Sequence, residues 1–317
     1  MQIDTNLARE IGYAATARTL PGRCVIRAME NATGRLGLIR RMRRAAPELG
    51  PGQSVWRSLT ETFGLTIELA GGSLDHLPAT GPLVVVSNHP FGILDGLVMG
   101  RLLSDLRGDA FRILAHRVFA AAPQIERAIL PISFDGTREA ARLNLDSRSE
   151  ALRHLDAGGA IGIFPGGTVS TAGTPMGLVR DPAWRAFTAK MIARSDATIV
   201  PVWFEGANSR LFQIASHLHY NLRMGLMIRE FAARVDRPVR IVVGKPIPRD
   251  TLDPRDPVAC MDSLRRSTYS LSPKALDPTL LGYEFEAKYK GRGDGSGHFR
   301  QWSGRTDGPE GDLRPAS

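Results

Sequence analysis

Short apolar runs alternate with longer segments of helical spacing through the middle of the chain. Seven runs between residues 65 and 243 are rich in β-branched and aliphatic side chains, the composition typical of buried strands. They span 65–69, 83–87, 111–114, 129–133, 160–164, 198–203 and 239–243. Helices are predicted over 94–106, 137–156, 184–195, 208–219 and 256–270. The alternation predicts an α/β fold with a mainly parallel central sheet of about seven strands flanked by helices.

The N-terminal sixty residues show a different pattern. Apolar side chains recur at steps of three and four through 22–46, at Val25, Met29, Ala32, Leu36 and Ile39. Arginines crowd around this stripe, at positions 23, 27, 35, 40, 41, 43 and 44. A basic amphipathic helix of this kind is able to lie in an anionic bilayer surface. The alternative is a helix packed on the core with solvated arginines, and Gly34 and Gly37 weaken an ideal helix.

These patterns divide the chain into three predicted parts. Residues 1–60 are predicted to be N-terminal membrane-docking helices, and residues 61–288 form the α/β domain. From Gly291 onward the sequence is glycine-rich, charged and poor in aliphatic residues. Residues 289–317 are therefore predicted to be a disordered tail.

Charge and composition favour some classes of binding partner and exclude others. The formal net charge is +9, and only five of the 41 basic residues are lysines. An arginine-rich surface favours phosphate-rich partners, either an anionic bilayer or nucleic acid. Five tyrosines and four tryptophans without aromatic–basic interleaving argue against nucleic acid. Two cysteines exclude a disulfide scaffold and a four-thiolate zinc site. With no apolar run of about 18 residues and no visible secretory signal, a soluble or membrane-peripheral protein is expected.

A candidate catalytic pair follows the predicted strand 83–87. His89 leaves the carboxyl end of that strand, Pro90 and Gly92 favour a tight turn, and Asp95 falls in the first turn of the next helix. A carboxylate on the imidazole Nδ1–H fixes the tautomer and leaves Nε2 as a proton acceptor. The alternative is that His89 is an ordinary turn residue and Asp95 a helix cap.

Two further loops follow other predicted strands. After 160–164, the adjacent Gly166 and Gly167 allow backbone N–H groups to turn towards an anion, and Thr168 and Ser170 add hydroxyl donors. A plain turn is the alternative for this loop. The run 198–203 contains Pro201, which predicts an edge strand or a bulge. After that run, Asn208 or Ser209 is placed to cap the following helix.

These three loops resemble, in order, the motif blocks of the glycerolipid acyltransferase superfamily, the PlsC-like or lysophospholipid acyltransferases. Asn88, His89 and Asp95 fit the first block, although five residues separate the His and Asp here and four do so in the family. In the block usually written FPEGTRS, Phe164, Pro165, Gly167, Thr168 and Ser170 match. Gly166 replaces its glutamate and Val169 its arginine.

The remaining blocks, and the departures from the family's motifs, indicate which branch of the superfamily the chain resembles. Val200, Pro201 and Val202 fit the V-P-V block, and residues 129–142, with Arg138 or Arg142, occupy the place of the phenylalanine-rich block. The departures are similar to the bacterial hemolysin-like and lyso-ornithine-lipid-type acyltransferases. Their motifs match at Asn88–Gly96, Phe164–Ser170, Pro201–Gln213 and Gly244–Ile247. The resemblance spans roughly residues 60–250.

The resemblance implies a reaction and a set of site residues. His89 would take the proton of an acceptor hydroxyl, Asp95 would orient it, and the oxygen would attack the thioester of acyl-carrier protein or acyl-CoA. Neither a metal, a cofactor nor a covalent acyl-enzyme is implied. The residues expected to bind the acceptor or the oxyanion are Asn88, Gly166, Gly167, Thr168, Ser170 and Arg142. Those expected to contact the acyl chain or to be structural are Phe91, Phe164, Pro165 and Pro201.

Partners and location follow from the same resemblance. The expected partners are an acidic acyl carrier protein, a lysolipid acceptor and an anionic membrane surface, and nucleic acid is not expected. The protein would be peripheral on the cytoplasmic face of the inner membrane. No G-x-S-x-G elbow or P-loop occurs, which argues against a serine hydrolase and a P-loop enzyme. The non-enzymatic alternative is a basic protein that binds a membrane or nucleic acid.

The two charges that the FPEGTRS block has and this chain lacks, at Gly166 and Val169, indicate which acceptor the chain would bind. Valine at 169 cannot replace an arginine fork on phosphate oxygens. The simplest inference is a lyso-aminolipid acceptor of the ornithine-lipid type, with an amino-acid-like headgroup on a hydroxy-acyl chain. The alternative is lysophosphatidic acid, with the phosphate contact supplied by another arginine. The candidates are Arg117, Arg142, Arg180 and Arg210.

Overall fold

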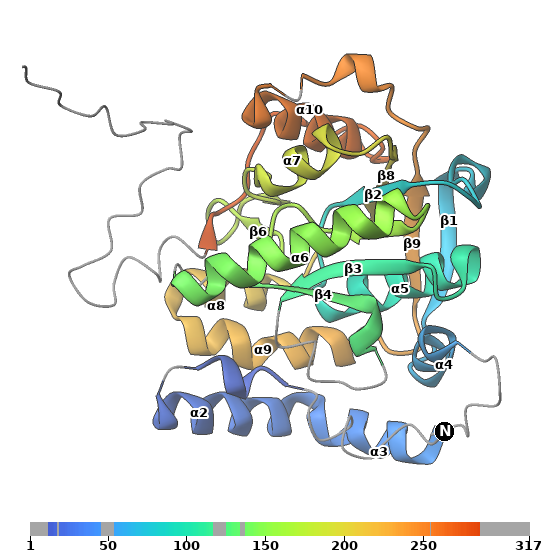
Figure 1. Cartoon of the computed structure of the whole chain (residues 1–317). Helices are drawn as coiled ribbons and strands as arrows, with labels where there is room; N and C mark the ends of the chain where they lie inside the picture. The colour runs from blue at the N-terminus through green and yellow to red at the C-terminus, as the bar shows by residue number, and fades with distance from the viewer. Residues whose placement is uncertain are drawn as a thin grey trace, which may run out of the picture.

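The computed structural model describes residues 12–17, 19–45, 54–116, 125–133, 137–253 and 255–285 (Figure 1). Its helices are α2 (Leu20–Glu30), α3 (Leu36–Ala45), α4 (Val55–Thr62), α5 (Ile93–Arg107), α6 (Arg138–Asp156), α7 (Phe187–Ala193), α8 (Arg210–Leu218), α9 (Tyr220–Ala232) and α10 (Pro257–Tyr269). Its strands are β1 (Thr66–Gly72), β2 (Leu83–Ser87), β3 (Phe111–His116), β4 (Ile129–Ile132), β5 (Ala160–Ile163), β6 (Thr171–Ala172), β7 (Val179–Arg180), β8 (Thr198–Phe204) and β9 (Pro238–Val243). Short 3₁₀ turns lie at Ala14–Thr16, Leu74–His76, Glu126–Ala128 and Arg249–Thr251.

The main sheet has seven strands in the order β1-β9-β8-β2-β5-β3-β4. Neighbouring strands run parallel except β8 and β9, which pair antiparallel. Each of the seven predicted runs forms one strand of this sheet, so the predicted α/β fold with a mainly parallel sheet is confirmed. The hairpin of β6 and β7 forms a separate two-stranded sheet, which the sequence did not predict.

Helices cover both faces of the sheet. Along β2, Leu83 and Val85 face a core shared with α4, α5 and α9, whereas Val84 and Val86 face one shared with α6, α7 and α10. This alternation follows from the two-residue period of a strand. In Figure 1 α10 and α7 lie at the top of the molecule, and α9 and α2 lie at the bottom. The central strands are buried on both faces, which explains their continuous apolar runs.

The N-terminal helices pack onto this body. α2 lies against α9, where Ile26 joins a cluster with Met224 and Phe285, and Leu38 of α3 enters the core beneath β2. The single helix predicted over 22–46 is broken by a π-helical turn over Asn31–Arg35. Gly34 adopts φ +144° there and approaches Ala232 so closely that a Cβ would lie 2.7 Å from the alanine Cβ. These contacts connect the N-terminal helices to the α/β body. The domain boundary predicted at residue 60 stays a prediction.

The apolar stripe predicted for the N-terminal segment divides between two surroundings. Val25, Ala32 and Leu36 are exposed, Met29 is half-buried, and Ile39 belongs to the core. Within the described residues, no helix is long and apolar enough to span a bilayer. The tail predicted to be disordered, 289–317, lies outside the described residues.

Pro201 occupies an interior strand, so the edge position predicted from it is wrong. In a strand, the N–H and C=O of one residue point to the same side. The Pro201 carbonyl accepts from the Gly244 amide at 2.9 Å, and the Ile199 carbonyl accepts from the Ile247 amide at 2.8 Å. The missing N–H of the proline therefore faces the segment that follows the end of β9 at Val243, where it interrupts no strand pairing.

Candidate active site

Three loops leave one edge of the sheet side by side. β2 lies between β5 and β8 and runs parallel to both, so the loops after these strands share the edge where such sheets bind ligands. Asn88 joins two of them, because its Nδ2 donates to the Phe204 carbonyl at 2.9 Å and its Oδ1 accepts from the Phe204 amide at 2.7 Å. The structure thus gives Asn88 a positioning contact, and its expected part in acceptor binding stays a prediction.

His89 and Asp95 meet at the start of α5. Nδ1 of His89 lies 2.9 Å from Oδ2 of Asp95, and their side chains are 19% and 0% exposed. The same Oδ2 accepts from the amides of Phe91 at 2.7 Å and Gly92 at 3.0 Å. The carboxylate therefore caps the helix and contacts the imidazole at once, which unites the two alternatives drawn from the sequence. Burial raises the pKa of the Asp95 carboxyl above its usual range, and its contact with His89 opposes that rise.

The glycine turn lies against the histidine. The ring of Phe164 stacks on the His89 imidazole with centroids 4.3 Å apart. Gly167 has φ +67°, a conformation that favours glycine, and its amide closes the turn onto the Phe164 carbonyl at 3.0 Å. Within the part of the chain that the structure describes, the amides of Gly166 and Thr168 make no hydrogen bond. The turn that follows Phe164 therefore holds two backbone donors without a partner in the described structure.

Asp181 is a buried residue of the site that the sequence did not single out. Its Oδ1 accepts from the His89 amide at 3.3 Å and from the Ser170 hydroxyl, and its Oδ2 accepts from Trp184 Nε1 at 2.9 Å. The Ser170 amide in turn donates to the His89 carbonyl at 2.8 Å. Asp181 thus fixes the backbone of the catalytic loop against the glycine turn. Asp181 follows a two-residue strand that apolar periodicity does not detect, and only the dipeptide Asp-Pro before a tryptophan marks it in the sequence.

The N-terminal segment reaches the back of the catalytic loop. Gly92 has φ +82°, and a Cβ there would collide with Met227 of α9 and lie 3.6 Å from the Tyr13 hydroxyl. Tyr13 is held in turn by its amide, which donates to the buried carboxylate of Glu30 on α2. Burial raises the pKa of Glu30, and Arg27, with its Nη1 3.2 Å away, opposes that rise. The region predicted to dock on a membrane is thereby coupled to the loop that carries His89.

The remaining predicted residues are distributed around this centre. Phe91 is buried, with the Arg234 guanidinium 3.6 Å from its ring centre, and the Pro165 carbonyl accepts from the Arg185 amide at 3.0 Å. Thr168 is buried, and its hydroxyl lies 3.4 Å from Nη2 of Arg223, which donates to the Val169 carbonyl at 2.9 Å. Arg223 is a fully buried arginine of α9, a helix that the sequence did not predict.

The arginines proposed for a phosphate contact do not gather at the catalytic loop. Arg142 is exposed on α6, and no hydrogen bond or ion pair of the described residues joins it to the motif loops. Arg180 is buried, and Arg210 donates to the Gly177 carbonyl. Arg117 lies outside the described residues. Across the described ranges no group of three or more His, Cys, Asp or Glu side chains is arranged to hold a metal ion, and the expectation of no cofactor stays a prediction.

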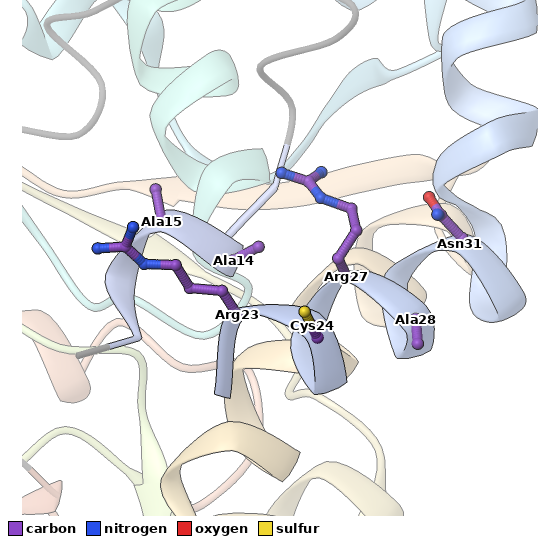
Figure 2. Close-up of a pocket in the computed structure, with 7 residues that line it drawn as sticks. All are labelled: Ala14, Ala15, Arg23, Cys24, Arg27, Ala28 and Asn31. Carbon is purple, nitrogen blue, oxygen red and sulfur yellow. The ribbon is translucent and has the colours of Figure 1, made fainter. Parts of the chain in front are cut away.

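A separate open pocket of about 630 Å³ lies on α2 (Figure 2). Figure 2 shows the guanidinium groups of Arg23 and Arg27 raised above the helix on either side of Ala14. Ala15, Cys24, Ala28 and Asn31 complete the lining. None of these residues belongs to the three motif loops, so the pocket is a feature of the N-terminal helices.

Comparisons with known proteins identify a family for the chain. The profile of a family described as Acyltransferase matches residues 10–277. The lyso-glycine lipid O-acyltransferase of Phocaeicola vulgatus is 27% identical over 204 residues, which cover 61% of this chain and 68% of that protein. The enzyme with the same name from Bacteroides thetaiotaomicron is 25% identical over 200 residues, covering 61% and 70%. The crystal structure of the 1-acyl-sn-glycerophosphate (LPA) acyltransferase PlsC from Thermotoga maritima covers 83% of this chain and 87% of its own, with 14% identity and a TM-score of 0.39.

Replacing His89 by alanine should abolish acyl transfer without unfolding the protein. Loss of a general base typically costs about 10²–10⁴ in rate. The measurement compares the initial rates of His89→Ala and of a control, His76→Ala. The ring of His76 lies by the Val243 carbonyl, outside the motif loops. Retention of more than about a tenth of the wild-type rate by His89→Ala would show that His89 is not the base.

Asp95→Asn should separate activity from stability. An asparagine oxygen in the place of Oδ2 still accepts from the Phe91 and Gly92 amides. The neutral amide no longer stabilises the imidazolium that forms when His89 takes a proton, so the rate should fall by about 10² or more. Because the pKa of Asp95 is raised in the folded state, the folded protein loses stability as the pH rises from the unfolded-state pKa of the carboxyl towards this raised value. Thermal unfolding at pH 5 and pH 8 should show a relative gain for the variant at pH 8. A variant destabilised more at pH 8 than at pH 5 would contradict the raised pKa.

Proposed function

Since the chain belongs to the Acyltransferase family, we propose that it is a lysolipid O-acyltransferase that uses His89 as its general base. One observation carries this proposal. A histidine in contact with a fully buried carboxylate lies beside a glycine turn with free amides, at the carboxyl edge of parallel strands. The names of the relatives from Phocaeicola vulgatus and Bacteroides thetaiotaomicron support a lysolipid acceptor.

The proposed reaction is a direct transfer. Nε2 of His89 takes the proton of the acceptor hydroxyl as its oxygen attacks the carbonyl carbon of the acyl thioester. Asp95 keeps the proton of Nδ1 in place and stabilises the imidazolium that forms. The tetrahedral intermediate then collapses with cleavage of the C–S bond, and the imidazolium returns its proton to the leaving thiolate. The products are an ester and a free thiol, without a covalent acyl-enzyme.

The glycine turn suits the developing oxyanion. The amides of Gly166 and Thr168 are free of other partners in the described structure, and Gly167 sets the turn that holds them beside the His89 ring. Donors fixed in this way need no reorganisation when charge develops on the carbonyl oxygen. Ser170 is a less available donor, because its hydroxyl is engaged with Asp181.

An amino-acid-like headgroup fits this turn better than a phosphate monoester. Val169, at the position of the family's arginine, packs in a buried apolar cluster with Phe212 and Met227. Gly166, at the position of the glutamate, backs onto the buried Asp181. Neither position offers a charge to a headgroup, so we extend the proposal to a lyso-aminolipid acceptor of the lyso-glycine or lyso-ornithine type. The similarity to lyso-glycine lipid O-acyltransferases supports this choice.

The donor and the location are part of the same proposal. A surface with 36 arginines suits an acidic acyl carrier protein as thioester donor, with acyl-CoA as the alternative. The N-terminal helices expose apolar and basic side chains together, at Val25 and Leu36 and at Arg23 and Arg40. This combination suits peripheral contact with an anionic bilayer, at the cytoplasmic face of the inner membrane. The pocket between Arg23 and Arg27 adds paired cations on this same surface.

The acceptor preference decides the substrate class. Turnover should be measured with a lyso-aminolipid and with lysophosphatidic acid under the same acyl donor, with product identified by mass spectrometry. The proposal expects faster turnover of the lyso-aminolipid. A tenfold or greater preference for lysophosphatidic acid, about 1.4 kcal/mol of transition-state binding, would contradict the aminolipid proposal and leave the acyltransferase proposal standing. Failure to acylate any lysolipid would contradict both.

A further inference from the structure

A second apolar surface lies on the β6–β7 hairpin and α8, outside the N-terminal helices. Met176 and Leu178 at the hairpin tip are 70% and 61% exposed. The outer face of α8 carries Leu211, Ile214 and Leu218, all exposed, at the i, i+3, i+7 spacing of one helix stripe. We call these five side chains the hairpin–α8 surface.

The hairpin and the helix are fastened into one unit. The Ala172 amide donates to Oε1 of the fully buried Gln213, and the Ala172 carbonyl lies 2.9 Å from a ring nitrogen of His217. At the tip, Arg210 donates to the Gly177 carbonyl. The tip and the outer face of α8 are therefore presented together rather than as two independent patches.

The composition of α8 is unusual for a helix at a water surface. Its inner face is buried through Phe212 and Ala215, and the outer face is apolar as well. The outer face of a helix at a water surface normally carries polar side chains. Contiguous exposed apolar side chains mark a site of contact with a protein or a membrane.

Charge selects the bilayer as the occupant. The sequence has no aspartate or glutamate from Gly166 to Arg180 or from Gly206 to Arg229, and Arg210 is exposed at the edge of the surface. Nothing acidic in these segments repels anionic headgroups. A strongly acidic carrier protein is better matched by clustered arginines, which the N-terminal helices carry and this surface does not. We propose that the hairpin–α8 surface inserts into the apolar boundary of the bilayer, as a second membrane contact.

The position of the hairpin gives this contact a function. The chain leaves the glycine turn at Ser170, whose amide donates to the His89 carbonyl, and it returns at Asp181, whose carboxylate accepts from the His89 amide. Residues 171–180 are thus a projection from both sides of the His89 backbone. Insertion of the tip would fix the active site against the membrane that holds the acceptor. In this respect the inference rests on the proposed function.

The two membrane surfaces lie on connected parts of the fold. Tyr220, at the start of α9 and two residues after Leu218, donates to the Thr16 carbonyl at 3.4 Å. In Figure 1 α8 lies at the left above α2, while α10 lies at the top. Val258 near the start of α10 is 75% exposed, belongs to neither surface and provides a matched apolar control.

Flotation with vesicles of phosphatidylcholine and phosphatidylglycerol, at high salt to suppress arginine attraction, tests the inference. Met176→Ser combined with Leu178→Ser should lower the partition coefficient about tenfold, because buried apolar area sets interfacial affinity. Val258→Ser should float like the wild type, and Val25→Ser with Leu36→Ser reports on the N-terminal helices separately. Equal flotation of the hairpin variant and the wild type would overturn the inference.

Two further measurements show whether a loss of flotation comes from loss of membrane contact or from misfolding. They also test the inference separately from the proposed function. A single Met176→Trp protein should gain a blue-shifted fluorescence component on vesicles that brominated lipids quench, and its absence would overturn the inference. The hairpin variant should acylate a short-chain, water-soluble lysolipid at the wild-type rate. A variant that floats normally but reacts more slowly with acyl-carrier protein would assign the surface to that protein instead. Flotation still decides the inference if no acceptor is turned over.

Discussion

Two buried carboxylates hold His89, one on its ring and one on its backbone. Asp95 contacts Nδ1, and Asp181 accepts the main-chain amide. A buried carboxylate is costly unless donors surround it, and here backbone amides, the Ser170 hydroxyl and the Trp184 indole supply them. The order of the sheet makes this possible, because β2 has β5 and β8 as parallel neighbours and brings all three loops to one edge. The histidine is thereby oriented before any substrate arrives.

The rest of the chain supports this arrangement from behind. α9 places Met227 under Gly92 and Arg223 behind Thr168, and the segment around Tyr13 closes over the same loop. α2 then packs on α9, so the N-terminal helices serve the site even where their outer face is exposed. The two exposed apolar surfaces, on α2–α3 and on the hairpin with α8, both belong to elements that contact the catalytic loops. Packing therefore connects both surfaces that we propose for membrane contact to the loop that carries His89.

Most of the sheet was predictable because its strands are short, apolar and bounded by turn residues. The three motif loops were predictable because each follows such a strand. α9 was missed because it buries Arg223 and Glu230 among apolar residues, which hides its period. Asp181 was missed because its role depends on contacts between distant segments. Of the two alternatives that Pro201 suggested, an edge strand or a bulge, the edge strand was wrong, because β9 ends at Val243 and no strand pairing needs an N–H at Pro201. The apolar stripe of 22–46 was only partly exposed, because Gly34 breaks the helix and turns Ile39 inward.

The proposed role of His89 as the general base depends on the tautomer of its ring. It is measurable by ¹⁵N NMR of the imidazoles at neutral pH, with the His89 signals assigned by their loss in His89→Gln. Contact of Nδ1 with Asp95 predicts a protonated Nδ1 and an Nε2 shift typical of an unprotonated ring nitrogen. A proton found on Nε2 in the neutral ring would contradict the assignment of His89 as a base oriented by Asp95.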